Sequence, residues 1–269
     1  MRLFQVDAFT AVPFSGNPAG VCLLDRAAKP DWMQKLALEM NLSETAFVWP
    51  RTGGFEIRFF TPAVEVPLCG HATLASAHIL YECGIQPRSS KIEFQAPAGR
   101  LTTRFEDDWI VMDFPAFGVT PCADREVVEE ILGVKPTAVF KSENGWHVAE
   151  MASTEEVVRV KPDLRRLLQS AVQELLVTGP GATTEVDFVS RFFAPRAGID
   201  EDPVTGSAHC ILTPFWSAKL GKSRMNARQV SARGGVLRVE SHPDRKRVLI
   251  EGQAVTLFRI ELTDHVPPP

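Results

Sequence analysis

The chain has 269 residues, of which 45% are hydrophobic and 23% are charged, a composition that is typical of a folded protein and excludes a disordered one. This length predicts one large domain or two smaller ones, with enough core to need neither disulfides nor a metal for stability. The net charge of 29 − 33 = −4, without a dense run of Lys and Arg, argues against nucleic-acid and membrane-surface partners.

The N-terminus and the cysteines indicate a cytoplasmic protein. Residues 1–7 meet a polar side chain too early for a signal peptide, and no run approaches the roughly 18 apolar residues of a membrane span. The cysteines are scattered without a CxxC spacing, which favours reduced thiols over a disulfide framework or a zinc site. They are Cys22, Cys69, Cys83, Cys122 and Cys210.

Short strand-like runs dominate the first half, each bounded by Gly, Pro or Asp. They cover residues 3–9, 19–24, 45–49, 55–60, 91–95, 100–105 and 109–114. Two helices interrupt them. The first spans residues 31–41 with Asp31 as its expected N-cap, and the second spans residues 70–81. Because the second is apolar on nearly every side, we expect it to be buried.

The second half shows the same pattern of short strands interrupted by helices. Strands are expected at residues 137–141, 146–151, 174–178, 187–193, 236–240, 247–251 and 255–262, and helices at 125–132, 163–169 and 206–220. Pro214 should kink the last helix or remove one of its backbone bonds. Strands and helices do not alternate, so we expect an α+β fold rather than parallel βαβ units. The linker at residues 119–124 gives domains of 1–118 and 119–269, with the last strand able to pack back on the first domain.

An internal repeat links the two halves. Arg58-Phe-Phe-Thr-Pro62 recurs 133 residues later as Arg191-Phe-Phe-Ala-Pro195, and Pro67-Leu-Cys-Gly-His-Ala72 recurs 136 residues later as Pro203-Val-Thr-Gly-Ser-Ala208. Both displacements are about half of the chain, which predicts a duplicated unit. Each copy sets Gly and a polar residue at an expected helix start, where free N–H groups and the helix dipole favour an anion. The repeat therefore predicts that two helix ends hold a small carboxylate across a cleft.

Polar candidates surround these turns, and each also has a structural interpretation. Glu44 could be a solvated residue before a strand, Asp202 a turn or N-cap residue, His71 a cap or a core histidine, and Cys69 a small buried residue. A carboxyl group in a dry cleft could instead exchange protons with carbon. The other histidines lack a spaced ligand partner, so no metal is expected. Signatures of nucleotide and dinucleotide binding and of common hydrolases are missing from the sequence.

Several long motifs in one order resemble the phenazine-biosynthesis PhzF-like family. They are Asp7-Ala-Phe-Thr10, Phe14-Ser-Gly-Asn-Pro-Ala19, Asn41-Leu-Ser-Glu-Thr-Ala-Phe47, Pro67-Leu-Cys-Gly-His-Ala-Thr-Leu-Ala75 and Glu201-Asp-Pro-Val-Thr-Gly-Ser-Ala208. The sequence is most similar to the branch called phenazine biosynthesis-like. The resemblance implies the diaminopimelate epimerase-like fold, in which two pseudo-symmetric domains each wrap a curved, mostly antiparallel sheet around a central helix.

The resemblance also implies an isomerase that needs no cofactor and acts on a small carboxylate bound between the domains. Glu44 matches the glutamate that shifts a proton between carbons, and His71 and Asp202 match neighbouring catalytic positions. The substrate-binding positions are matched by Gly70, Gly206, Ser207, Cys69 and, less closely, Asn17. A homodimer is compatible with the family, although no surface stripe in the sequence shows one.

One departure from the fold's epimerases bears on mechanism. Those enzymes carry a thiol before each helix-start glycine, whereas here Cys69 has Thr205 as its counterpart. Because Thr is a far weaker base than a thiolate, a one-base mechanism through Glu44 is preferred. Two alternatives stay open: an amino-acid epimerase or racemase that uses Cys69, and a non-catalytic binding protein that keeps the fold.

Overall fold

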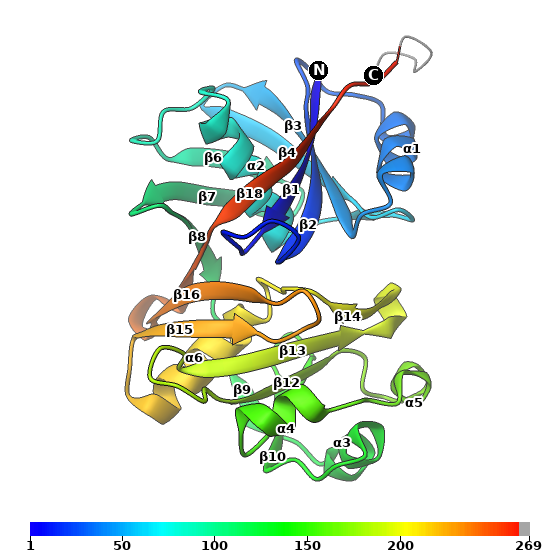
Figure 1. Cartoon of the computed structure of the whole chain (residues 1–269), viewed down its shortest axis with the longest axis vertical. Helices are drawn as coiled ribbons and strands as arrows, with labels where there is room; N and C mark the ends of the chain where they lie inside the picture. The colour runs from blue at the N-terminus through cyan, green and yellow to red at the C-terminus, as the bar shows by residue number, and fades with distance from the viewer. Residues whose placement is uncertain (264–269) are drawn as a thin grey trace. The chain divides into compact units, whose positions relative to one another are not determined.

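The computed structural model describes residues 1–263 and divides the chain into two compact units. Unit 1 comprises Met1–Asp113 and Glu251–Pro269, and unit 2 comprises Phe114–Ile250. The division falls a few residues before the expected one at residue 118. The C-terminal strand β18 (Ala254–Ile260) pairs antiparallel with β1 (Arg2–Ala8), and Figure 1 shows the red strand beside the dark-blue one. The first and last parts of the chain therefore share one sheet in unit 1.

Unit 1 is a mixed, mostly antiparallel sheet with two helices. Its further elements are β2 (Asn17–Leu23), α1 (Pro30–Met40), β3 (Glu44–Arg51), β4 (Gly54–Phe60), β5 (Glu65–Val66), α2 (Gly70–Glu82), β6 (Ile92–Ala96), β7 (Gly99–Glu106) and β8 (Trp109–Pro115). The pairs β2–β3 and β4–β6 are parallel, and the others in this unit are antiparallel. Helix α1 begins one residue earlier than expected, with Lys29 rather than Asp31 as its N-cap, because Pro30 fits the first helical position.

Helix α2 is the buried helix that the sequence predicts. Ten of its thirteen residues are buried, and it contacts β1, β2, β3 and β18. Small residues make this close packing feasible, and the hydroxyls of Thr73 and Ser76 bond to carbonyls of the preceding turn, so that they leave no unpaired polar atom in the core. The strands of unit 1 thus pack around α2, whose N-terminal residues are Gly70 and His71.

Unit 2 repeats this plan with more helices. Its elements are β9 (Val119–Pro121), α3 (Arg125–Leu132), β10 (Ala138–Ser142), β11 (His147–Glu150), α4 (Thr154–Arg159), α5 (Leu164–Gln169), β12 (Leu175–Pro180), β13 (Phe188–Ala194), β14 (Ile199–Asp202), α6 (His209–Leu220), β15 (Arg224–Gln229), β16 (Gly235–His242) and β17 (Arg247–Gly252), with short 3₁₀ turns at Pro195–Ala197 and Pro243–Arg245. The pairs β11–β12 and β13–β15 are parallel, as β2–β3 and β4–β6 are in unit 1.

The arginine of the repeated Arg-Phe-Phe motif contacts a glutamate and a phenylalanine in both units. Arg58 in β4 forms a two-pronged ion pair with Glu65 of β5 and lies over the ring of Phe60. Arg191 in β13 pairs in the same way with Glu201 of β14 and lies over Phe193. Each strand pair leads into the turn before the buried helix, so the duplication extends from the sequence to the side-chain contacts.

Helix α6 differs from the expected helix in two respects. It begins at His209 rather than Gly206, because residues 206–208 form a tighter turn with i to i+3 bonds, such as His209 N–H to Gly206 C=O at 3.0 Å. The helix also continues through Pro214. Proline cannot donate to the carbonyl of Cys210, and the N–H of Phe117 bonds to that carbonyl at 2.9 Å instead.

No helix among residues 1–263 is both long enough and apolar enough to cross a bilayer.

Candidate functional site

Two predicted site residues lie at the starting ends of neighbouring parallel strands. Asn17 is the first residue of β2 and Glu44 the first of β3, and the strand register sets Glu44 opposite Ala19. Gly16 turns the chain into β2 at φ +68°, and a Cβ there would lie 2.2 Å from the carbonyl oxygen of Ala8. Only glycine fits this turn, which fixes where Asn17 enters the sheet.

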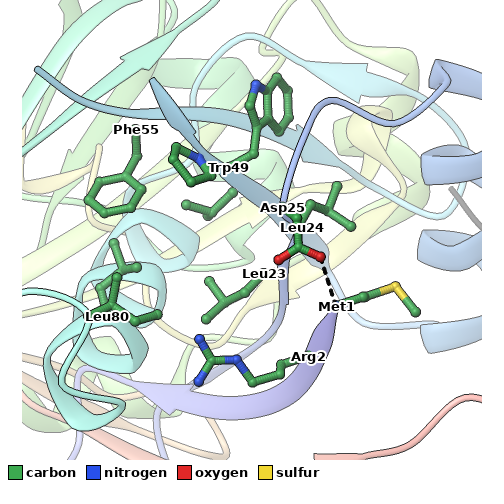
Figure 2. Close-up of a pocket in the computed structure, with 11 residues that line it drawn as sticks. Met1, Arg2, Leu23, Leu24, Asp25, Trp49, Phe55 and Leu80 are labelled. Atoms are coloured by element: carbon green, nitrogen blue, oxygen red, sulfur yellow. Dashed lines mark hydrogen bonds and ion pairs between the residues drawn. The ribbon is translucent and has the colours of Figure 1, made fainter. Parts of the chain in front are cut away.

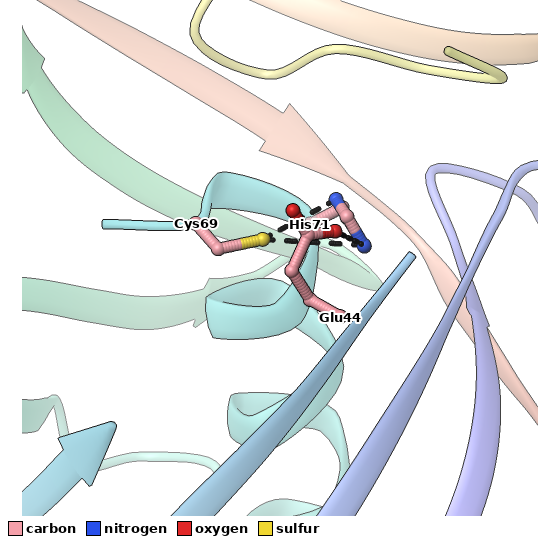
Figure 3. A group of neighbouring side chains, drawn as sticks. All are labelled: Glu44, Cys69 and His71. Atoms are coloured by element: carbon pink, nitrogen blue, oxygen red, sulfur yellow. Dashed lines mark hydrogen bonds and ion pairs between the residues drawn. The ribbon is translucent and has the colours of Figure 1, made fainter. Parts of the chain in front are cut away.

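The N-terminus of α2 brings two more predicted residues to the same place. Cys69 is the N-cap of the helix, and its side chain makes no capping bond. His71, in the first turn, lies with Nε2 3.2 Å from Oε2 of Glu44. The Cys69 Sγ lies 3.4 Å from Nδ1 of His71. Figure 3 shows the three side chains of Glu44, Cys69 and His71 converging on one point.

Asn17 and Ser43 orient the imidazole of His71. The Asn17 amide Nδ2 lies 3.3 Å from Nδ1 of His71, and the Ser43 hydroxyl lies 3.2 Å from Nε2 and 3.3 Å from Oδ1 of Asn17. An amide N–H can only donate, so Nδ1 must accept it and the proton of a neutral ring resides on Nε2. The ring then directs its N–H towards Ser43 and Glu44, which is the orientation needed to pass or hold a proton beside the carboxylate.

Glu44 is the ionisable centre of this group. Its side chain is only 13% exposed, and burial raises the pKa of the carboxyl group, while bonds from Ser43 and Cys69 lower it in part. Its Oε2 is buried and accepts no well-formed hydrogen bond within residues 1–263, despite the nearby imidazole. A carboxylate that is poorly solvated on one oxygen is a stronger base than one in water, as proton abstraction from carbon requires.

The same cluster has the donor set of a cation site. One ligand atom each from Glu44, Cys69 and His71 lie within 4.8 Å of one another. A carboxylate, a thiolate and an imidazole together could bind a zinc-type ion, so this chemistry competes with proton transfer as a use for the site.

In unit 2, the turn that follows β14 carries the other predicted residues. Asp202 is the last residue of β14, and the Thr205 hydroxyl donates to its Oδ2 at 2.5 Å. Gly206 is buried and Ser207 half-buried, one turn before α6 rather than at its first residue. The prediction that Gly206 and Ser207 begin an α-helix is therefore wrong, although their backbone N–H groups still precede the helix in a tight turn.

Two buried side chains hold this turn, and neither was expected to matter. Gln229, the last residue of β15, accepts from Thr205 N–H at 2.9 Å and donates to Asp202 C=O at 2.7 Å. The His209 Nδ1 bonds to Thr205 C=O at 2.9 Å, and burial lowers the pKa of this imidazole to about 4, so the ring is neutral. Together they fix the backbone on both sides of Asp202 and Thr205.

The loop between β1 and β2 is held by a residue of the first family-like motif. Asp7 is fully buried and accepts the backbone N–H of Phe14 at 2.8 Å. Phe14 has φ +66° and is 73% exposed, an unusual state for a large aromatic residue. Asp7 therefore stabilises the loop that precedes Asn17.

A separate pocket in unit 1 contains none of the predicted site residues. It encloses about 140 Å³ and lies at the far end of β3, roughly 16 Å along the strand from Glu44. Figure 2 shows apolar side chains around it, including Leu23, Trp49 and Leu80, with the N-terminal amine bonded to Asp25. Its lining contains no histidine or cysteine, so we do not assign the chemistry to it.

Of the residues that the sequence analysis missed, Ser43 had the clearest signal, since it precedes Glu44 within a motif quoted for the resemblance. Gln229 had none, because it lies 24 residues after Thr205 in a strand that was not predicted. The sequence pattern reveals local partners of a site more readily than distant ones.

The chain matches the family model described as phenazine biosynthesis-like protein over residues 6–259. It is 43% identical to an uncharacterized isomerase of Halalkalibacterium halodurans over 263 residues, 97% of each chain. The crystal structure of a putative phenazine biosynthesis PhzC/PhzF protein from Clostridium difficile matches with a TM-score of 0.90 and 38% identity, covering 98% of this chain and 99% of that one.

A more distant structure shares the fold. It is a probable proline racemase from Agrobacterium radiobacter, 11% identical with a TM-score of 0.64, covering 98% of this chain and 93% of that one. The chain therefore belongs to the phenazine biosynthesis-like family, has the α+β fold of the related epimerases and racemases, and is an isomerase.

Proposed function

We propose that this isomerase acts on a small carboxylate without a cofactor, and that Glu44 moves a proton from one substrate carbon to another. The observation that carries the proposal is the Glu44 carboxylate, which is 13% exposed and has its buried Oε2 3.2 Å from Nε2 of His71. Burial raises the pKa of Glu44, and its Oε2 has no hydrogen bond of good geometry within residues 1–263. Such a group is a competent base at neutral pH and, once protonated, a competent acid.

In the proposed reaction, one Glu44 oxygen removes a proton from a carbon conjugated with an unsaturated group. The electron pair of the broken C–H bond delocalises over the conjugated system, and Glu44 returns the same proton to a different carbon. His71 keeps its Nε2–H towards Glu44, and Asn17 and Ser43 hold the ring in that orientation. A single base acts from one face, so the shift is suprafacial.

The carboxylate substrate class is inferred from the backbone. The first N–H groups of α2, beginning at Gly70, have no partner within the helix and lie at its positive end. For the turn of unit 2, taken by itself, we propose that Gly206, Ser207 and Asp202 form a binding site for a small polar ligand. A probable proline racemase of the same fold binds carbonate, which is consistent with an affinity for small oxyanions.

Hydrogen exchange tests the proposal. Small unsaturated carboxylates and α-amino acids are incubated with the enzyme in D₂O, and NMR follows both the formation of the rearranged isomer and the appearance of deuterium on carbon. We expect turnover by the wild type and by Glu39→Gln, which alters an exposed glutamate of α1, and at least ~10²-fold slower turnover by Glu44→Gln. Equal turnover by Glu44→Gln and wild type would refute the role of Glu44.

The alternative function, an epimerase, depends on the thiol of Cys69. The Cys69 Sγ lies 3.4 Å from the His71 ring, close enough for the imidazole to take its proton and create a nucleophilic or basic thiolate. If Cys69 is the base, Cys69→Ala should abolish α-carbon exchange of an amino acid while Glu44→Gln retains part of it. In the one-base isomerase, Cys69→Ala should stay within about tenfold of wild type. If no compound of the panel were either exchanged or isomerised, a binding protein would be favoured.

A further inference from the structure

The beginning of α3 carries a second group of chemically reactive side chains, outside the site described above. Cys122 follows β9, Asp124 is the N-cap of α3, and His147 begins β11. One ligand atom from each lies within 4.8 Å of the other two. We propose that these three residues form a binding site for a zinc-type divalent cation in unit 2.

The Asp124 carboxylate is directed to the cluster rather than to the helix. Aspartate is a favoured N-cap because its oxygen can accept an N–H of the first turn, yet Asp124 makes no capping bond. Its Oδ2 instead lies 2.9 Å from Nε2 of His147. The chain therefore gives up an ordinary helix-capping contact to hold a carboxylate against an imidazole.

His147 is positioned as a rigid ligand. The side chain is only 2% exposed, and the backbone N–H of His147 bonds to Glu174 C=O at 3.0 Å. Its Nδ1 is buried and makes no hydrogen bond within residues 1–263. Because no partner fixes the tautomer from that side, the proton can move from Nε2 to Nδ1 and leave Nε2 free to bind a cation.

Cys122 supplies the third donor from a fixed backbone. Its N–H bonds to Val139 C=O at 3.3 Å, which ties it to β10, and its Sγ lies within 4.8 Å of the ligand atoms of Asp124 and His147. The side chain is half-buried, and that of Asp124 is 40% exposed, so a cation can reach both from solvent.

This donor set selects the kind of ion. A thiolate, an imidazole and a carboxylate suit zinc better than magnesium or calcium, which prefer oxygen ligands alone. Ligands at the usual zinc distances lie roughly 3.3–3.6 Å apart in a tetrahedron, so the 2.9 Å contact of Asp124 with His147 needs only a small opening. Binding converts the Cys122 thiol to a thiolate, its proton passes to solvent, and water completes the fourth position.

Cobalt(II) serves as the probe because thiolate ligation gives a near-ultraviolet charge-transfer band. Glu44, Cys69 and His71 could also bind the ion, so the titration uses Cys69→Ala as its background. We expect a band at one cobalt per chain in Cys69→Ala, displaced by zinc, and the same band in Cys69→Ala/Cys83→Ala, which removes another half-buried thiol. In Cys69→Ala/Cys122→Ala the band should vanish and zinc affinity fall at least ~10-fold.

A second variant separates the loss of a metal ligand from misfolding of the protein. Asp124→Asn keeps the size of a partly exposed side chain, and in the Cys69→Ala background it should keep the metal-free melting temperature while weakening zinc binding at least ~10-fold. A cobalt band that persists without Cys122, one that requires Cys83, no band in Cys69→Ala, or unchanged zinc affinity in Asp124→Asn would each overturn the site.

Discussion

The turn that carries Asp202 and Thr205 depends on one buried amide, and Gln229→Leu tests that dependence. Gln229 is fully buried, and its side chain accepts from Thr205 N–H and donates to Asp202 C=O and to the Thr205 hydroxyl. Leucine has a similar volume, so packing is retained while these bonds are lost. The substitution leaves the buried Thr205 N–H without its acceptor and removes the two bonds that the amide donates, to Asp202 C=O and to the Thr205 hydroxyl.

The expected cost follows from these three bonds. An unsatisfied buried N–H costs about 1–3 kcal/mol and each of the other two lost bonds about 0.5–1.5 kcal/mol, so the loss of stability should be roughly 2–6 kcal/mol. At about 2–4 °C per kcal/mol for a chain of this size, the melting transition of unit 2 should fall by at least ~4 °C. Urea unfolding followed by circular dichroism measures the free energy directly.

Gln34→Leu is the matched control. Gln34 is half-buried in α1 and makes one side-chain bond, to Thr61 C=O at 2.9 Å, so its loss should cost no more than about 1 kcal/mol. If Gln229→Leu costs no more than Gln34→Leu, the amide does not hold the turn and the reasoning fails.

Three further predictions use the same unfolding assays. Arg191→Ala should lower the free energy of unfolding by about 3 kcal/mol and Arg58→Ala by about 1 kcal/mol. Both arginines pair with a glutamate, but Arg191 also bonds to the carbonyls of Val157, Val158 and Val160. Equal losses for the two variants would contradict this. Gly16→Ala should lose at least ~1 kcal/mol, because alanine is strained at φ +68° and its Cβ meets the Ala8 carbonyl; an unchanged midpoint would refute the clash. Glu44→Gln should be more stable than wild type at pH 7 and equal to it near pH 4. Burial raises the pKa of Glu44 in the folded state. The protonated carboxyl group therefore contributes its full stability below the unfolded pKa of about 4.3, and this stability is lost as the pH rises through the folded pKa. A stability difference between Glu44→Gln and wild type that does not change with pH would argue against this.

The sequence predicts the parts of the fold that repeat or alternate. Helix α2 is recognisable because it is apolar on every side, and the Arg-Phe-Phe motif marks both β4 and β13. Strand β15 escapes prediction because its sequence, Arg-Met-Asn-Ala-Arg-Gln, has only two apolar residues, and its innermost position is filled by Gln229. That glutamine is buried because the turn of unit 2 needs its amide, a requirement that no local pattern shows.

The sequence also predicts part of the candidate site and misses another part. Asn17, Glu44, Cys69 and His71 come together because β2, β3 and α2 meet in one unit, and the motifs already marked each of them. The start of α6 was misplaced by three residues, since tight turns and α-helices share their first contacts and sequence patterns rarely separate them. The catalytic roles of these residues stay predictions.

The divergence between the two copies of the turn bears on stereochemistry. In unit 1 the residue before the glycine is Cys69, with a thiol beside an imidazole. In unit 2 it is Thr205, whose hydroxyl is already engaged as a donor to Asp202 and receives a bond from Gln229. Threonine is a far weaker base than a cysteine thiolate, so the second copy of the turn lacks the thiol that the first copy has. A thiol in only one of the two copies agrees with the proposal that Glu44 alone moves a proton between carbons, and it disfavours a two-thiol inversion of a single centre. Intramolecular transfer of substrate hydrogen to product in D₂O is the corresponding observable, whereas complete exchange at one inverted carbon would show that a second base takes part.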